Sequence, residues 1–187
     1  MIYGSALYSA TFTPPTSPFT VLQSTTAAIT GTQTALLALQ TTVTSDASSN
    51  AFTLTATGTP TSVSLPSPFA IHTNSAFFDG STAYLSISQS AGSISTGQFT
   101  IECWMYPLAY NSSIFIEDAF WYAGYNGGWY LMLNTDGTVS LSGSNGSYNT
   151  TVGFLQTTST MSLNQWTHFA CTRDSSCLLY TSPSPRD

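Results

Sequence analysis

The chain has 187 residues, of which 42% are hydrophobic, 13% aromatic and only 5% charged, with a formal net charge of −6. There is no lysine, and the basic residues are Arg173 and Arg186, which argues against a nucleic-acid partner because phosphate binding depends on Lys and Arg. The same scarcity argues against anionic lipid, and no apolar run approaches the roughly 20 residues of a membrane span. We therefore expect a folded domain with a polar, almost uncharged surface and no membrane insertion.

The N-terminal third alternates between linker-like and strand-like stretches. Residues 14–33 are rich in Pro, Thr and Ser, which is typical of a linker. The segment TALLALQ at 34–40 fits a short amphipathic helix or an apolar strand. Residues 49–58 and 61–65, rich in Thr and other strand-favouring residues, are expected to form strands.

From residue 74 onward the sequence alternates between strands and turns. Residues 77–88 combine a short apolar start, an Asp79–Gly80 turn and an alternating strand, and residues 99–105 alternate clearly before Pro107. Turn residues recur about every 8–12 positions, which predicts an all-β sandwich or barrel. The remaining expected elements are strands in 112–117, 149–156 and 164–174 and a hairpin in 129–143 with Asn134 to Gly137 as its connection.

Paired carboxylates suited to glycoside hydrolysis are missing from the expected strands. A sandwich glycosidase needs two acids that share a strand face and flank the scissile bond. Glu117 and Asp118 are adjacent and would point to opposite faces, and Glu102 has no acidic neighbour at two or four positions. His72 and His168 are far apart, and no serine lies in a G-x-S-x-G elbow. We therefore expect that the chain is not an enzyme.

The segment EDAFWYAGYNGGWY, residues 117–130, has the composition of a sugar-binding loop. It places Trp121, Tyr122 and Tyr125 close to Asn126 among glycines. Aromatic faces stack on the apolar C–H patches of sugar rings, and an amide can then fix the hydroxyls, so a loop carrying these four residues over a rigid sheet is a candidate glycan site. The alternative is that Trp129, Tyr130 and Trp121 are core or strand-edge residues.

Two residues of the expected strand at 99–105 form a second candidate site. Trp104 and Glu102 share the face opposite Ile101. If that face is concave and open, both are ligand contacts. If it is covered, Trp104 belongs to the core.

Four motifs together resemble a known family. FFDGSTAYLSI, QFTIECWMYP, GGWYLMLNTDGTVSL and LNQWTHFACTRD are similar to the laminin-G-like, concanavalin A-like superfamily, in the variant common in bacteriophage tail and other virion-surface proteins and in bacterial secreted proteins. The resemblance covers about residues 34–176. It implies an antiparallel jelly-roll β-sandwich, with an early hairpin at the FDG motif and a strand at 34–40.

The resemblance also makes calcium a candidate cofactor. Relatives of this fold often bind one Ca²⁺ on the rim of the sandwich, through carboxylates and backbone carbonyls. Asp79 and Asp136 are the candidate ligands here, with Asp46 as a further one, and calcium needs six to eight oxygens in all. The alternative is that these are turn aspartates whose carboxylates accept backbone N–H groups.

The resemblance further predicts that the chain is a piece of a longer protein. The family domain needs more strands after residue 176, so residues 34–176 would be an incomplete sandwich, and residues 1–13 resemble the closing strand of a preceding repeat. Residues 177–187, CLLYTSPSPRD, have a permitted back-translation that looks like a transposon-end sequencing adapter. We therefore expect this segment to be an artefact, the alternative being an ordinary Ser/Pro-rich tail.

The resemblance and the missing catalytic acids together imply a function. We expect a non-catalytic glycan- or surface-binding module of a phage or virus structural protein such as a tail fibre. Its partner would be a glycan or cell-surface polysaccharide, its place the virion surface, and its parent fibre a candidate homo-oligomer. The alternatives are a structural spacer repeat, and a binding module of a bacterial secreted adhesin or enzyme.

Overall fold

The structure is a computed structural model. It describes residues 1–3, 5–8, 12–22, 29–40, 42–65, 68–69, 75–87, 97–122, 125–144, 151–176 and 179–185. For residues 3, 118–122, 125–127, 144, 151–154 and 179–185 the description covers the backbone. Within these ranges no helix is long and apolar enough to cross a bilayer.

The described residues are almost entirely β. Their only helix is a short 3₁₀ turn, η1, at Gly31–Gln33. The strands are β1 Ile2–Tyr3, β2 Leu54–Thr57, β3 Thr61–Val63, β4 Ser75–Phe77, β5 Tyr84–Ile87, β6 Phe99–Met105, β7 Ser113–Tyr122, β8 Tyr125–Leu133, β9 Val139–Ser144, β10 Thr151–Gln156, β11 Thr167–Arg173 and β12 Leu179–Pro185.

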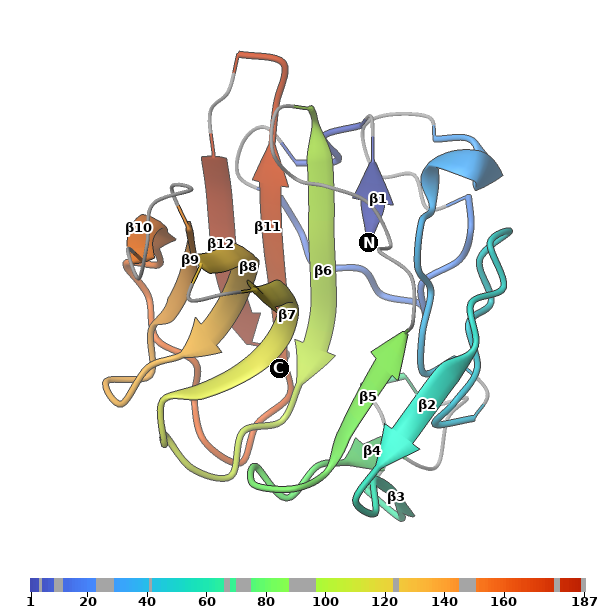
Figure 1. The fold of residues 1–187 in the computed structure, drawn as a ribbon, viewed down its shortest axis with the longest axis vertical. Coiled ribbons are helices and arrows are strands. Elements are labelled where there is room, and N and C mark those ends of the chain that lie inside the picture. The colour runs from blue at the N-terminus through green and yellow to red at the C-terminus, as the bar shows by residue number, and fades with distance from the viewer. Residues whose placement is uncertain are drawn as a thin grey trace. The chain divides into compact units, whose positions relative to one another are not determined.

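The strands form sheets whose paired registers are antiparallel (Figure 1). Two four-stranded sheets have the orders β1-β6-β11-β12 and β10-β9-β8-β7, and two-stranded ladders join β2 to β5 and β3 to β4. This confirms the predicted all-β class and its antiparallel sheets. The strands expected around β2, β3, β6, β7, β10 and β11 are confirmed as well.

The chain divides into two compact units. The first comprises Met1–Glu102 with Ala170–Tyr180, and the second comprises Cys103–Phe169 with Thr181–Asp187. Strand β1 pairs with β6 inside the first unit, with Ile2 opposite Thr100. Residues 1–13 therefore belong to the same unit as the start of the predicted domain, while their origin in a preceding repeat stays a prediction.

The core of the first unit is closed by the N-terminal segment. The ring of Tyr8 stacks on that of Phe12 with centroids 3.8 Å apart. Burial of such aliphatic and aromatic side chains supplies most of the free energy that favours folding. The buried side chains of this cluster are Ile2, Leu7, Tyr8, Ile29 and Ala170, and Phe12 packs against them.

Buried hydroxyls hold the N-terminal segment to the central strands. Thr100 of β6 is fully buried, and its Oγ1 lies 3.2 Å from Oγ1 of Thr172 of β11. The same oxygen accepts the backbone N–H of Leu7 at 3.0 Å, and its hydroxyl lies 3.3 Å from the carbonyl of Ser5. These contacts satisfy polar groups that would be costly to bury unpaired, so Thr100 fixes the segment around Leu7 in place.

Residues 34–40 do not form the predicted strand. They make only isolated bridges, from Thr34 to Ile2 and from Ala38 to Asp46. Leu39 has a φ of 64°, in the left-handed region, which is incompatible with an extended strand. The apolar side chains that suggested a strand are buried all the same, at Ala35 and Leu37.

The carboxylate of Asp46 organises the loop that replaces this strand. Its Oδ1 accepts the N–H groups of Leu37 and Ser48, each at 2.9 Å. Its Oδ2 accepts the N–H of Phe52 at 2.9 Å and the hydroxyl of Ser48 at 2.8 Å. Partial burial raises the pKa of Asp46, but these hydrogen bonds to Leu37, Ser48 and Phe52 outweigh it and leave the pKa below its usual 3.8.

The second unit contains the predicted β8–β9 hairpin. Its connection is the one expected. The N–H of Asn134 donates to the carbonyl of Thr138 at 2.8 Å, and the N–H of Gly137 donates to the carbonyl of Asn134 at 3.0 Å. The ring of Phe115 of β7 meets that of Phe169 of β11 edge-on at 5.8 Å. The buried side chains of the hairpin alternate along both strands: Trp129, Leu131, Leu133, Val139 and Leu141.

We predict that Asp46→Asn lowers the free energy of unfolding at neutral pH by about 1–3 kcal/mol, because the substitution removes charge-assisted hydrogen bonds. The lowered pKa of Asp46 means that its stabilisation is complete above its usual 3.8 and is lost as the pH falls through the folded-state value. Urea unfolding at a series of pH values should therefore show the gap between wild type and variant shrinking below about pH 4. A gap that stays constant down to about pH 2 would contradict this account.

Candidate functional site

The aromatic segment 117–130 is a hairpin, which corrects the prediction of a loop. Strand β7 runs through Tyr122 and β8 begins at Tyr125. The sequence is rich in aromatic residues, which favour strands, and the ladder satisfies backbone groups that a loop would leave to water. Trp121 is the register partner of Asn126, and Tyr122 that of Tyr125.

The four candidates of this segment therefore form two successive cross-strand pairs near the end of the β7–β8 ladder. Residues 118–122 and 125–127 are described by their backbone, so the side chains of all four lie outside the described part of the structure. Their role in binding stays a prediction. The alternative interpretation is confirmed for Trp129, whose side chain is only 4% exposed and belongs to the core.

The second candidate pair, Glu102 and Trp104, is engaged in packing. In the first unit the hydroxyl of Tyr8 donates to Oε2 of Glu102 at 2.6 Å, and Glu102 lines a small hollow with Phe19 and Leu37. In the second unit Trp104 is half-buried, and its ring centroid lies 5.2 Å from that of the fully buried His168. Both residues thus have structural contacts in the units to which they belong.

The carboxylate of Asp79 is occupied by its own turn. Its Oδ1 accepts the N–H groups of Ser81, Thr82 and Ala83 at 2.8–2.9 Å, and its Oδ2 accepts the Thr82 hydroxyl at 2.6 Å. The hydroxyl of Thr82 and then the three amides lower the pKa of Asp79 strongly. An aspartate that caps its own turn in this way is a structural residue.

Asp136 has the same kind of role in the β8–β9 connection. Its Oδ1 accepts the hydroxyl of Thr138 at 2.6 Å and the N–H of Thr138 at 2.9 Å. The pKa of Asp136 is lowered by that hydroxyl and then by the amide. Thr138 is buried, so this contact also satisfies a polar group inside the second unit.

The described residues fit the turn alternative better than a calcium site. Among them no group of three or more His, Cys, Asp or Glu side chains lies close enough to hold a metal ion. A calcium ion at Asp79 would compete with four donors that already point at the carboxylate, and it would still need most of its six to eight oxygens from elsewhere.

The FDG motif does not form the predicted hairpin between its two strands. Instead β5 pairs with β2, with Tyr84 opposite Thr57, and β4 pairs with β3, with Phe77 opposite Thr61. Both strands therefore lie against one continuous segment, residues 54–63, and residues 78–83 leave the ladder as a loop. Figure 1 shows the two ladders beside each other in the first unit.

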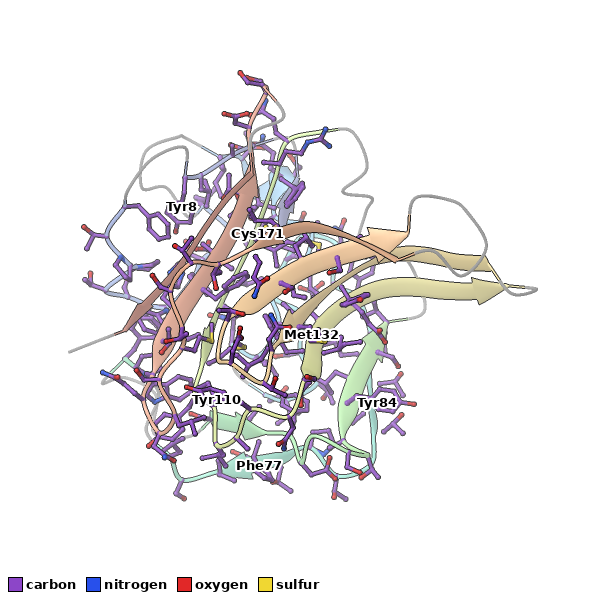
Figure 2. The ribbon with its side chains drawn as sticks, turned by 90° about the vertical axis from the view of Figure 1, so that its left-hand side faces the viewer. Tyr8, Phe77, Tyr84, Tyr110, Met132 and Cys171 are labelled. Atoms are coloured by element: carbon purple, nitrogen blue, oxygen red, sulfur yellow. The ribbon has the colours of Figure 1, made fainter. Side chains whose placement is uncertain are left out.

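Three aromatic side chains are exposed around this loop. Phe77 is 39% exposed, Phe78 37% and Tyr84 53%, and Figure 2 labels Phe77 on β4 and Tyr84 on β5. We call the three residues the aromatic rim. Sequence reasoning missed the rim because it assigned Phe77 and Phe78 to the apolar start of a hairpin and Tyr84 to its second strand. The sequence signal that could have identified these residues is the clustering of three large aromatic residues around one Asp-Gly turn.

The turn between β2 and β3 packs directly beneath this loop. Gly58 has a φ of +65°, and a Cβ added there would lie 2.5 Å from the carbonyl oxygen of Thr82. Only glycine allows both this backbone conformation and this close approach. The loop is thus held from below by Gly58 and from within by Asp79.

A family model described as the concanavalin A-like lectin/glucanases superfamily matches residues 79–180, more than half of the chain. The chain belongs to this superfamily. Its laminin G-like domains are generally non-catalytic binding modules, although some members are glycosidases. The match extends four residues into the segment 177–187, whose adapter origin stays a prediction. No curated protein and no solved structure matches the chain.

We predict that Gly58→Ala destabilises the protein markedly more than Gly80→Ala. Both glycines have a positive φ, +65° and +70°, but a Cβ at Gly80 would meet nothing within 4 Å. Gly80→Ala should therefore cost only the left-handed strain of about 1–2 kcal/mol, and Gly58→Ala should add a backbone clash of at least about 1 kcal/mol. Equal midpoints of urea unfolding for the two variants would show that the loop does not pack on Gly58.

Proposed function

We propose that this chain is a non-catalytic module that binds a neutral glycan. The observation that carries the proposal is the use of its carboxylates in a lectin-type domain: Asp46, Asp79 and Asp136 hold their own loops, and Glu102 accepts the hydroxyl of Tyr8. Glycoside hydrolysis needs two acids free to act on the substrate. Four of the eight acidic residues are engaged in this way, which favours recognition by hydroxyl, amide and aromatic groups.

The charge of the chain supports a neutral ligand. Arg173 and Arg186 are its only cations, and the net charge is −6. A polyanionic glycan would be repelled by this field and would find few partners for its carboxylate or sulfate groups. A neutral polysaccharide meets a surface rich in Thr, Ser and Asn without such a cost.

The proposed setting is the virion surface, in a tail fibre or a similar structural protein that attaches to a host polysaccharide. The resemblance of the four sequence motifs to phage-type domains supports this setting, as does the shortage of charge. A bacterial secreted adhesin is the other setting in which such a module occurs. Sequencing the genes on either side separates the two, because virion assembly genes would favour the first.

We predict that the full chain, immobilised and exposed to an array of neutral and acidic oligosaccharides, retains neutral ones only. Mass spectrometry of a retained oligosaccharide after prolonged incubation should find it intact, because Asp46, Asp79, Asp136 and Glu102 already accept hydrogen bonds within the protein. Retention of no glycan would contradict the binding proposal. Release of shorter products would contradict its non-catalytic part.

A further inference from the structure

We propose that the aromatic rim, Phe77, Phe78 and Tyr84, is the surface that contacts the sugar, and that it does so without calcium. This inference rests on the proposed function and names its contact site. The ligand class is a neutral oligosaccharide that presents the apolar C–H face of a pyranose ring.

The first argument is the exposure of the rim. Single apolar residues on a protein surface are ordinary, but a cluster of large ones marks an interaction site. Thr57 and Thr61, the register partners of Tyr84 and Phe77, are four residues apart, so at most about 14 Å of chain separates them. The three residues thus lie at the two ends of one loop, within reach of a single oligosaccharide.

The second argument is the rigidity of the loop beneath the rings. Four hydrogen bonds to Asp79 fix residues 79–83, and Gly58 supports the carbonyl of Thr82 from below. Phe and Tyr side chains have few rotatable bonds, so they lose little entropy when a ligand is bound. A platform held in place before binding reduces the ordering cost of association.

The third argument is the chemistry around the rings. Exposed hydroxyl side chains lie close by in the ladder and loop, including Thr57, Thr61 and Ser81, and they can hydrogen-bond sugar hydroxyls. The only charged group of the loop, Asp79, already accepts four donors and has no basic partner to recruit an anion. Aromatic faces with uncharged hydroxyls match a neutral sugar better than an acidic glycan or a lipid headgroup.

The same hydrogen bonds argue for calcium-independent binding. A calcium ion at Asp79 would compete with the amides of Ser81, Thr82 and Ala83 for Oδ1 and with the Thr82 hydroxyl for Oδ2. That competition would weaken the turn on which the rim stands. Binding should therefore survive a chelator.

The test measures affinity for a neutral oligosaccharide that the full wild-type chain retains on the array. Tyr84→Ala and Phe77→Ala should each weaken the Kd about tenfold or more, since truncating an aromatic binding anchor commonly has an effect of that size. Tyr84→Phe keeps the ring and should bind within about threefold of wild type. Leu108→Ala, which truncates a side chain 58% exposed in the second unit, should bind as wild type does.

The Tyr84→Leu variant keeps a large apolar side chain but lacks the aromatic ring, so it separates the effect of the ring from that of side-chain size. It also tests the site if an alanine variant does not fold. The proposal expects it to bind as weakly as Tyr84→Ala, with an unfolding curve like that of wild type. Addition of EDTA should leave the wild-type Kd unchanged.

The outcomes of these measurements distinguish a failure of the proposed contact site from a failure of the proposed function. If wild type retains a neutral glycan and the Tyr84→Leu and Phe77→Ala variants bind it equally well, the site is wrong and the proposed function stands. If EDTA abolishes binding, the calcium-independent mode is wrong. If wild type retains no glycan but a cell-surface protein is captured through Tyr84, both the site's ligand and the proposed function are overturned.

Discussion

The hydrogen-bonding needs of irregular backbone govern much of this structure. Loops that lie between strands have N–H groups without ladder partners, and buried or crowded N–H groups must find acceptors. The chain meets this need with aspartate carboxylates: Asp46, Asp79 and Asp136 accept amides and hydroxyls from residues close by in sequence. Each carboxylate shapes one loop through these hydrogen bonds.

The loop fixed by Asp79 carries the surface that we propose to contact a sugar. Hydrophobic burial would favour folding Phe77, Phe78 and Tyr84 inward, yet all three remain more than a third exposed. The Asp79 turn and Gly58 hold the backbone of the loop that separates these residues. A rigid, uncharged aromatic surface is suited to the C–H face of a neutral sugar, and the shortage of cations leaves few competing ligand classes.

The success of sequence reasoning differed between elements for physical reasons. The strand at 99–105 and the connection at Asn134–Gly137 were predicted correctly, because side-chain alternation and turn residues are local properties. Residues 34–40 were assigned wrongly, because Asp46, six or more residues away, holds them as a loop. The segment 117–130 was expected to be a loop from its glycines and aromatics, but cross-strand pairing of Trp121 with Asn126 and of its neighbours makes it a hairpin.

The sequence by itself determined the all-β class and the charge-poor surface, since composition and period-two patterning express these directly. The superfamily was indicated by the resemblance of four motifs, which are local stretches of sequence. Only the tertiary structure decided which strands pair and which aromatics stay outside. The two strands around the FDG motif look like a hairpin in sequence, but both lie against residues 54–63. That choice depends on contacts between distant segments, such as Gly58 against Thr82, and it alone turns the motif's Phe77, Phe78 and Tyr84 into an exposed rim.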